Sequence, residues 1–80
     1  MIAKVTVTLK SGVLDPQGKA VHRSLESLGF KSISDVRVGK HIELTLSPKI
    51  SVAQAKKEVS QMCEKLLANE VIEDYAFELL

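Results

Sequence analysis

The stretch from Ile33 to Ser47, read ISDVRVGKHIELTLS, constrains the fold of this chain more than any other. Two short runs with strand-like alternation, Ile33 to Val38 and His41 to Leu46, meet at Gly39-Lys40. A glycine-containing pair between two such runs is typical of a β-hairpin. One strand-like run and one helix-like run lie on each side of it. The pattern therefore predicts the order β-α-β-β-α-β.

The segment before the hairpin is predicted to be a strand followed by a helix. Asp15 suits a helix N-cap and Pro16 the first helical position, and Gly29 suits the end of the helix, with Phe30 folding back onto it. The strand is indicated by strict alternation, with apolar residues at Ala3, Val5, Val7 and Leu9. The helix is indicated by helical spacing of Ala20, Val21, Leu25 and Leu28.

The segment after the hairpin predicts a second helix and a final strand. Ser51 and Gln54 form an S-x-x-Q capping box, and Asn69 can end the helix in the left-handed region. The run from Val71 to Leu80 follows as a strand, with apolar residues on both of its sides. The helix carries an apolar stripe made of Val52, Ala55, Val59, Met62, Cys63 and Leu66.

These elements define an α+β domain with a ferredoxin-like fold, spanning residues 1–80 as a single domain. We expect an antiparallel sheet with both helices on one face and the other face uncovered. A domain of this size buries a small core, and a single cysteine excludes an internal disulfide. These limits favour self-association through the sheet.

Candidate catalytic groups are few, and we predict no catalytic, metal or cofactor-binding residue. Cys63 lies in mid-helix on the apolar stripe, which favours an inert core thiol. His22 and His41 are far apart and have no third ligand for a metal. Arg37 and Lys40 flank the hairpin turn, where they either bind an anion or are solvated. No phosphate-binding glycine motif is present.

The charge of the chain is nearly balanced but unevenly distributed. Residues 1–50 carry eight Lys and Arg against four Asp and Glu, whereas residues 51–80 carry three against six. Such a split can steer docking to another protein or simply form a solvated surface. The opening MIAKVTVTLK resembles no signal peptide and no run is long enough to span a membrane, so we expect a cytoplasmic protein.

Three stretches together resemble one known family, in order and along essentially the whole chain. They are VLDPQG from Val13 to Gly18, VRVGK from Val36 to Lys40 followed by IEL, and CEKLLAN from Cys63 to Asn69 followed by VIEDY. The set resembles the PurS family, the small accessory subunit of phosphoribosylformylglycinamidine synthase, also called formylglycinamide ribonucleotide amidotransferase. Such sequences often have proline where this chain has Glu70, which affects only the end of the helix.

The resemblance implies a subunit with no activity of its own in an enzyme complex of de novo purine biosynthesis. The implied partners are a glutaminase and a large synthetase, which uses ATP and Mg to convert formylglycinamide ribonucleotide to formylglycinamidine ribonucleotide. It also implies self-association as a homodimer or a dimer of dimers. The residues we expect to contact partners are Gln17, Gly18, Arg37, Gly39, Lys40, Tyr75 and Phe77.

Three other classes of protein share this element order. An RNA-binding module would stack bases on exposed aromatic side chains, but Thr6, Thr8 and Glu43 stand on the polar side of the sheet. A small acylphosphatase-like enzyme would need an Arg-bearing glycine-rich loop before the first helix, and none is present. A ligand-sensing domain that binds small molecules at a dimer interface remains as the other alternative.

Overall fold

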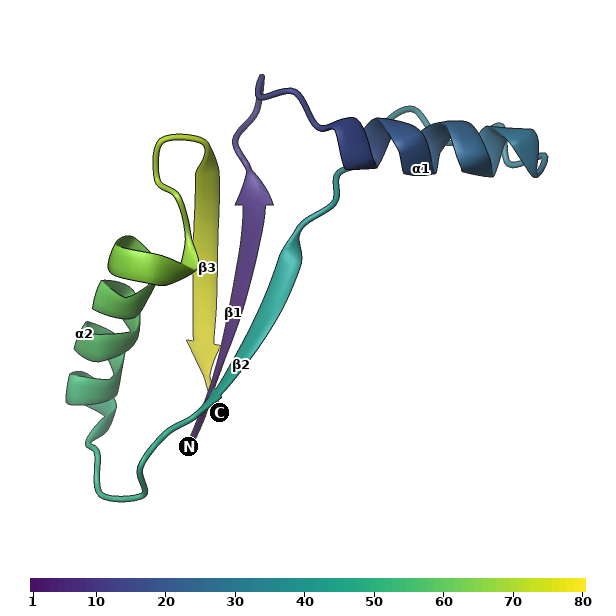
Figure 1. The fold of residues 1–80 in the computed structure, drawn as a ribbon. Helices are drawn as coiled ribbons and strands as arrows, with labels where there is room; N and C mark the ends of the chain where they lie inside the picture. Colours follow the sequence, from purple (N-terminus) through teal and green to yellow (C-terminus); the bar gives the residue numbers. More distant parts are fainter.

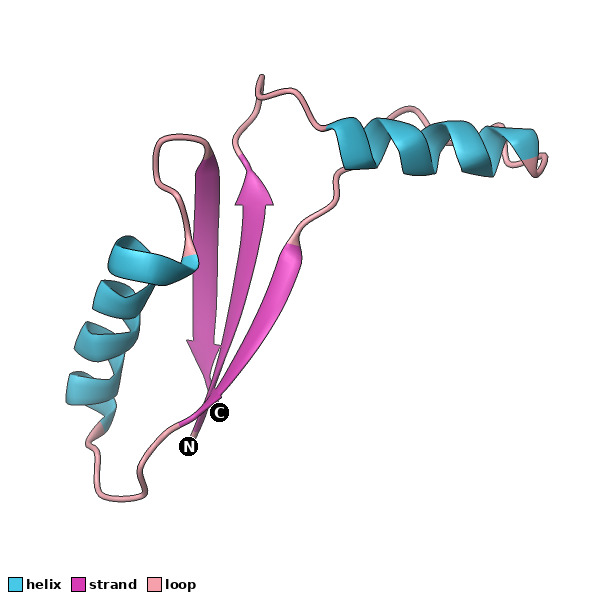
Figure 2. Ribbon diagram, viewed as in Figure 1, coloured by secondary structure: helices cyan, strands magenta, loops and turns pink.

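The computed structural model describes residues 1–80 as three strands and two main helices (Figure 1). The distribution of helix, strand and loop along the chain can be followed in Figure 2. None of the helices is both long and apolar enough to cross a membrane. The elements are β1 (Ile2–Leu9), α1 (Pro16–Ser27), β2 (Lys40–Thr45), α2 (Val52–Met62), a π-helical turn (Cys63–Leu67) and β3 (Glu73–Leu79).

The sheet has the strand order β2-β1-β3, and β1 pairs antiparallel with both neighbours. Val5 lies opposite Ile42 on one side and Phe77 on the other. The predicted alternation of β1 is confirmed, because its apolar residues Ala3, Val5 and Val7 are buried. These three strands have the order that a ferredoxin-like sheet requires, and the α+β class is confirmed.

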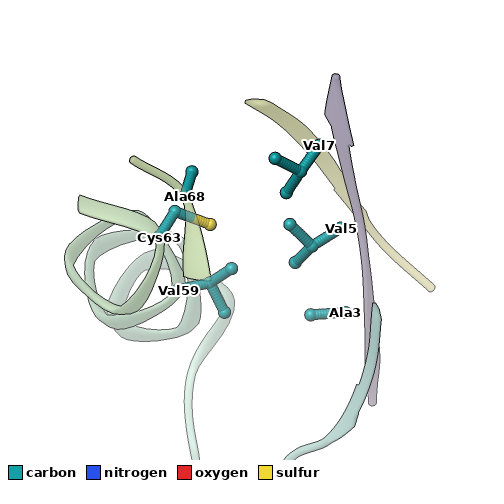
Figure 3. Close-up of a cluster of buried hydrophobic side chains, with 6 residues drawn as sticks. All are labelled: Ala3, Val5, Val7, Val59, Cys63 and Ala68. Atoms are coloured by element: carbon teal, nitrogen blue, oxygen red, sulfur yellow. The ribbon is translucent and has the colours of Figure 1, made fainter. Parts of the chain in front are cut away.

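The core lies between β1 and the second helix. Val59 and Cys63 point towards β1 from the helix, and Ala68 adds to them where the helix has ended (Figure 3). The buried part of the predicted stripe is thus confirmed, while Val52, Met62 and Leu66 are exposed. Half-buried apolar residues surround this core: Ile42, Leu44, Leu46, Leu67, Tyr75, Phe77 and Leu79.

The helix ends follow local rules with one exception. The Ser51 side chain accepts a hydrogen bond from the Gln54 N–H at 3.1 Å, which caps α2. Gly29 has φ +100°, and the Phe30 N–H donates to the Leu25 carbonyl, as predicted for the end of α1. Asn69, however, does not adopt the predicted left-handed conformation. The helix ends in the π-helical turn instead, and the Asn69 carbonyl accepts hydrogen bonds at the turn into β3.

The predicted hairpin is wrong in its first half. Residues 33–38 form no strand, and β2 begins only at Lys40. The physical reason is that backbone groups of this run are engaged elsewhere: the Val38 N–H donates to the Asp15 carboxylate, and the Val36 carbonyl lies against Gly18. The sheet therefore lacks the fourth, edge strand of a complete ferredoxin-like fold.

The predicted placement of both helices on one face of the sheet is also wrong. Only α2 packs on the sheet, whereas α1 projects away from it on the side of β2 (Figure 1). Gly18 is the only buried residue of α1. The apolar residues of α1 therefore contribute nothing to the core of this chain.

Candidate docking site

The candidate site is a joint where the end of β1, the start of α1 and the returning chain before β2 meet. Asp15 is at its centre with only 8% of its surface exposed. One carboxylate oxygen accepts a hydrogen bond from the Gly18 N–H, and the other accepts one from the Val38 N–H, both at 2.9 Å. We call Asp15, Gly18, Arg37 and Val38 the Asp15 joint. One side chain thus caps α1 and fixes the chain that returns from it.

Arg37 strengthens the joint from the outside. Its Nη2 donates to the carbonyl oxygens of Leu9 at 2.6 Å and Lys10 at 2.9 Å, just beyond the end of β1. Its Nε lies 4.0 Å from the Asp15 carboxylate. Hydrogen bonds from Gly18 and Val38, with a smaller effect of the Arg37 charge, lower the pKa of Asp15, although desolvation opposes them.

Two glycines allow the close backbone contacts of this region. A Cβ atom on Gly18 would lie 2.2 Å from the Val36 carbonyl oxygen. A Cβ atom on Gly39 would lie 2.3 Å from the Val7 carbonyl oxygen. Any side chain at either position would push the backbones apart. Both residues, predicted as partner contacts, therefore also have a packing role within the chain.

Two shallow depressions flank Asp15 and bring together most of the residues predicted to contact partners. The first, of about 290 Å³, is lined by Val7, Leu9, Asp15, Pro16, Gln17, Val38, Gly39, Lys40 and Glu73. The second, of about 270 Å³, is lined by Gly12, Val13, Leu14, Asp15, Lys19, Asp35, Val36 and Arg37. The region offers exposed polar side chains around a fixed backbone, which suits recognition of a protein surface.

Tyr75 and Phe77 lie elsewhere, on β3, and are not part of this region. Both are half-buried and pack against the core formed by β1 and α2. The Tyr75 hydroxyl lies 3.5 Å from the hydroxyl of Ser60 on α2. Their positions give both residues a structural role in holding α2 on the sheet.

The titratable groups of the chain form no reactive cluster. His22 Nε2 lies 2.9 Å from the Ile33 carbonyl oxygen, and His41 lies beside Glu43. The structure contains no group of three His, Cys, Asp or Glu that could hold a metal. Cys63 is fully buried, and burial, with a smaller effect of Glu64, raises the pKa of its thiol. A thiol in this state is an inert packing group.

Sequence reasoning missed the second role of Asp15. The Asp-Pro pair identified the helix cap, but the contact to Val38 spans 23 positions along the chain. No local pattern reports a contact between residues so far apart. The run from Val36 to Lys40 contains the residue that contacts Asp15, but its alternating pattern predicted a strand of a hairpin rather than this contact.

A small α+β chain whose buried Asp15 fixes an exposed polar surface beside α1 has the features of a binding subunit. The chain matches the sequence model of PurS, described as phosphoribosylformylglycinamidine (FGAM) synthase, over residues 2–80, and it belongs to this family. It is 51% identical over 76 residues to the PurS subunit of phosphoribosylformylglycinamidine synthase of Bacillus subtilis, covering 95% of this chain and 88% of that one.

Solved structures agree with this assignment over the whole chain. The structure of B. subtilis PurS has a TM-score of 0.85 with 51% identity, covering 96% of this chain and 94% of that one. A chain in the structure of PurLQS from Thermotoga maritima has a TM-score of 0.75 with 27% identity, covering 100% and 99%. The protein is a subunit of this synthase in purine biosynthesis.

Proposed function

We propose that the chain acts by contact alone, holding a glutaminase and a large ATP-dependent synthetase in a fixed arrangement. The glutaminase would release ammonia from glutamine, and the synthetase would use it to convert formylglycinamide ribonucleotide to the amidine. Free ammonia is protonated and diluted in water, so two such active sites must be held in register. ATP and Mg belong to the synthetase in this proposal, and the complex works in the cytoplasm.

The observation that carries this proposal is the match to a chain of the T. maritima PurLQS structure along the full length of both chains. The chemistry of the present chain is consistent with it, because its one thiol is buried with a raised pKa. The polar groups of the Asp15 joint are engaged in holding backbone segments together. They fix a surface rather than attack a substrate.

The surface that we assign to a partner is the depression beside α1 that includes Gln17, Gly39 and Lys40. Gln17 and Lys40 are exposed, and neither side chain has a hydrogen-bond partner within the chain. Arg37 lies on the other side of Asp15, where its guanidinium already binds two carbonyl groups. The chain also self-associates through its sheet, as a homodimer or a dimer of dimers.

The test is reconstitution of the synthase from its purified subunits. The chain alone should turn over neither glutamine nor ATP, and adding it to the other two subunits should restore glutamine-dependent amidine formation. Turnover of glutamine or ATP by the purified chain would refute the proposal. So would full glutamine-dependent activity of the two partners without it.

The docking surface is tested by Gln17→Glu combined with Lys40→Glu, with Lys57→Glu on α2 as the control for added negative charge. We expect the double variant to keep the thermal unfolding temperature of the wild type and to bind the partners at least about tenfold more weakly, since buried interface charges are costly when unpaired. The control should bind normally. Equal binding by all three chains would show that this surface is not used.

A further inference from the structure

The two most exposed large apolar side chains of the molecule lie on one short connection between α2 and β3. Leu66 is 82% exposed and Val71 is 83% exposed, more than any other large apolar residue of the chain. We call residues 63–72, which contain both, the α2–β3 connection. Neither side chain is part of the core, and neither lines the depression beside α1. Both are therefore available for contact with another protein.

The π-helical turn at the end of α2 is what places Leu66 outside. Helical spacing puts Leu66 on the same side of the helix as Val59 and Cys63. The turn is closed, however, by a hydrogen bond from the Ala68 N–H to the Cys63 carbonyl at 3.0 Å, which spans five residues instead of four. The wider turn gives the core position to Leu67 and turns Leu66 outward. Single π-helical turns are found frequently at functional sites.

Asn69 holds the rest of the connection in a fixed conformation. Its side-chain oxygen accepts a hydrogen bond from the Val71 N–H at 3.1 Å, and its own N–H donates to the Glu73 carboxylate at 2.7 Å. Its carbonyl accepts from the N–H groups of Ile72 and Glu73. The Lys10 N–H donates to the Ile72 carbonyl at 2.8 Å, which ties the turn to the end of β1. A side chain presented from a fixed turn loses little conformational entropy when it binds.

The charged groups around the connection are mostly acidic. Residues 63–80 carry one cation, Lys65, against five carboxylates: Glu64, Glu70, Glu73, Asp74 and Glu78. Asp74 is paired with Lys10 at 2.8 Å, whereas Glu64 and Glu70 are exposed and form no ion pair within the chain. A depression of about 360 Å³ beside the turn is lined by Lys10, Glu70, Glu73, Asp74 and Tyr75. The complementary partner surface is an apolar pocket with Lys or Arg at its rim.

This surface adjoins the depression beside α1 but has the opposite charge. Glu73 lines both depressions, so the two surfaces share an edge at the start of β3. The free charged side chain of the first surface is the cation Lys40, whereas those of the second are the anions Glu64 and Glu70. A protein surface that is complementary to one is repelled by the other. The two surfaces therefore suit two different partners that meet beside Glu73.

We propose that the α2–β3 connection is a second docking surface, and that it holds the one of the two partner subunits that does not bind beside Lys40. Leu66 and Val71 enter an apolar pocket of that subunit, and Glu64 and Glu70 pair with Lys or Arg at the rim of the pocket. The inference rests on the proposed function, since a chain that holds two subunits together needs two surfaces. It adds where the second surface lies and the chemistry of what binds there.

The first test measures the concentration of the chain that gives half-maximal glutamine-dependent activity when it is added to the two purified partners. Leu66→Ala with Val71→Ala changes the connection, and Val52→Ala, at another exposed apolar residue of α2, is the matched control. The double variant should need a concentration about thirtyfold higher or more, because a few side chains that fill pockets dominate such interfaces. The control should match wild type. A double variant that also matches wild type would overturn the proposal.

The acidic rim is tested by Glu64→Gln with Glu70→Gln in the same assay at two salt concentrations. At low salt this variant should need a concentration several times higher than wild type needs. The difference should disappear at high salt, where exposed charges are screened. No difference at low salt, or the same difference at both salt concentrations, would overturn the pairing of these carboxylates with a cationic rim.

The third test identifies the partner on each surface by photochemical cross-linking in the assembled complex. Lys65→Cys on the connection and Gln17→Cys beside α1 are each labelled with a photoreactive maleimide, and the buried Cys63 stays unreactive in the folded chain. The two probes should cross-link different partner subunits. Cross-linking of the same subunit by both probes, or of no partner by the probe on the connection, would overturn the proposal.

These outcomes separate the second surface from the proposed function. Full glutamine-dependent activity of the two partners without the chain would refute both. If wild type is required for activity and the connection variants act at the same concentration as wild type, only the second surface is overturned.

Discussion

Replacing Gly18 by alanine sets two effects of opposite sign against each other. Gly18 lies in the first turn of α1 and does not have a positive φ, so helix propensity alone predicts that alanine stabilises the chain by up to about 1 kcal/mol. The added Cβ, however, would lie 2.2 Å from the Val36 carbonyl oxygen and 2.8 Å from an Asp15 carboxylate oxygen. Carbon atoms essentially never approach within 3.0 Å in this way, so the surrounding backbone must move.

The structure indicates that the contact dominates. Overpacking typically costs about 1–3 kcal/mol, and the Val36 carbonyl cannot rotate away because Val38, close behind it, is hydrogen-bonded to Asp15. A cost near 3 kcal/mol less the propensity gain leaves a net loss of about 2 kcal/mol in the free energy of unfolding. For a domain of this size the unfolding temperature should fall by about 10 °C.

The assay is urea-induced unfolding followed by circular dichroism, at one fixed protein concentration. Ser24→Ala is the matched control, because Ser24 is exposed in the same helix and should gain about 0.5 kcal/mol from propensity. If Gly18→Ala leaves the free energy of unfolding unchanged or raises it, the close approach of the two backbones at the Asp15 joint is wrong. The Asp15 joint would then not be what holds α1 away from the sheet.

Three further predictions concern single side chains. The pKa of Asp15 is lowered from its ordinary 3.8, so its carboxylate contributes to the free energy of unfolding above that pH, and this contribution is lost as the pH falls through the folded-state pKa. Below pH 4 the free energy of unfolding should therefore fall less steeply with pH for Asp15→Asn than for wild type, and equal slopes would contradict this. The Cys63 thiol should react with a disulfide reagent at pH 8 only in denaturant, and rapid reaction of the folded chain would show that it is accessible. Val59→Ala should lower the free energy of unfolding by about 2–3 kcal/mol, measured in urea, since the side chain is fully buried against β1; a loss below 1 kcal/mol would mean that this core is not close-packed.

Much of the local structure could be predicted from the sequence because its causes lie within a few residues. The alternation of Val5 and Val7, the Asp15 cap and the Ser51 cap each depend on neighbours along the chain, and each was predicted correctly. The α+β class follows from the order of these elements. The family was recognised from three short stretches, and the match over residues 2–80 confirms it.

The candidate site was only partly predictable. Gln17 and Lys40 were identified through family resemblance, and the structure places them in one depression beside Asp15. Tyr75 was expected as a separate contact in the last strand, and the structure adds that it packs on the core and that its hydroxyl lies beside Ser60 of α2. Alternation reports which side of a strand a residue occupies, but not which part of the molecule covers that side.

The sequence by itself determined where α1 and α2 begin, which side of β1 is buried, and the family to which the chain belongs. Only the tertiary structure decided that residues 33–38 leave the sheet and that α1 stands apart from it. The reason is a competition for the same backbone groups: the Val38 N–H can pair with a neighbouring strand or with the Asp15 carboxylate, and both partners suit the local pattern. The carboxylate prevails because it also caps α1 and lies beside Arg37, so one side chain satisfies groups from both α1 and the returning chain at once.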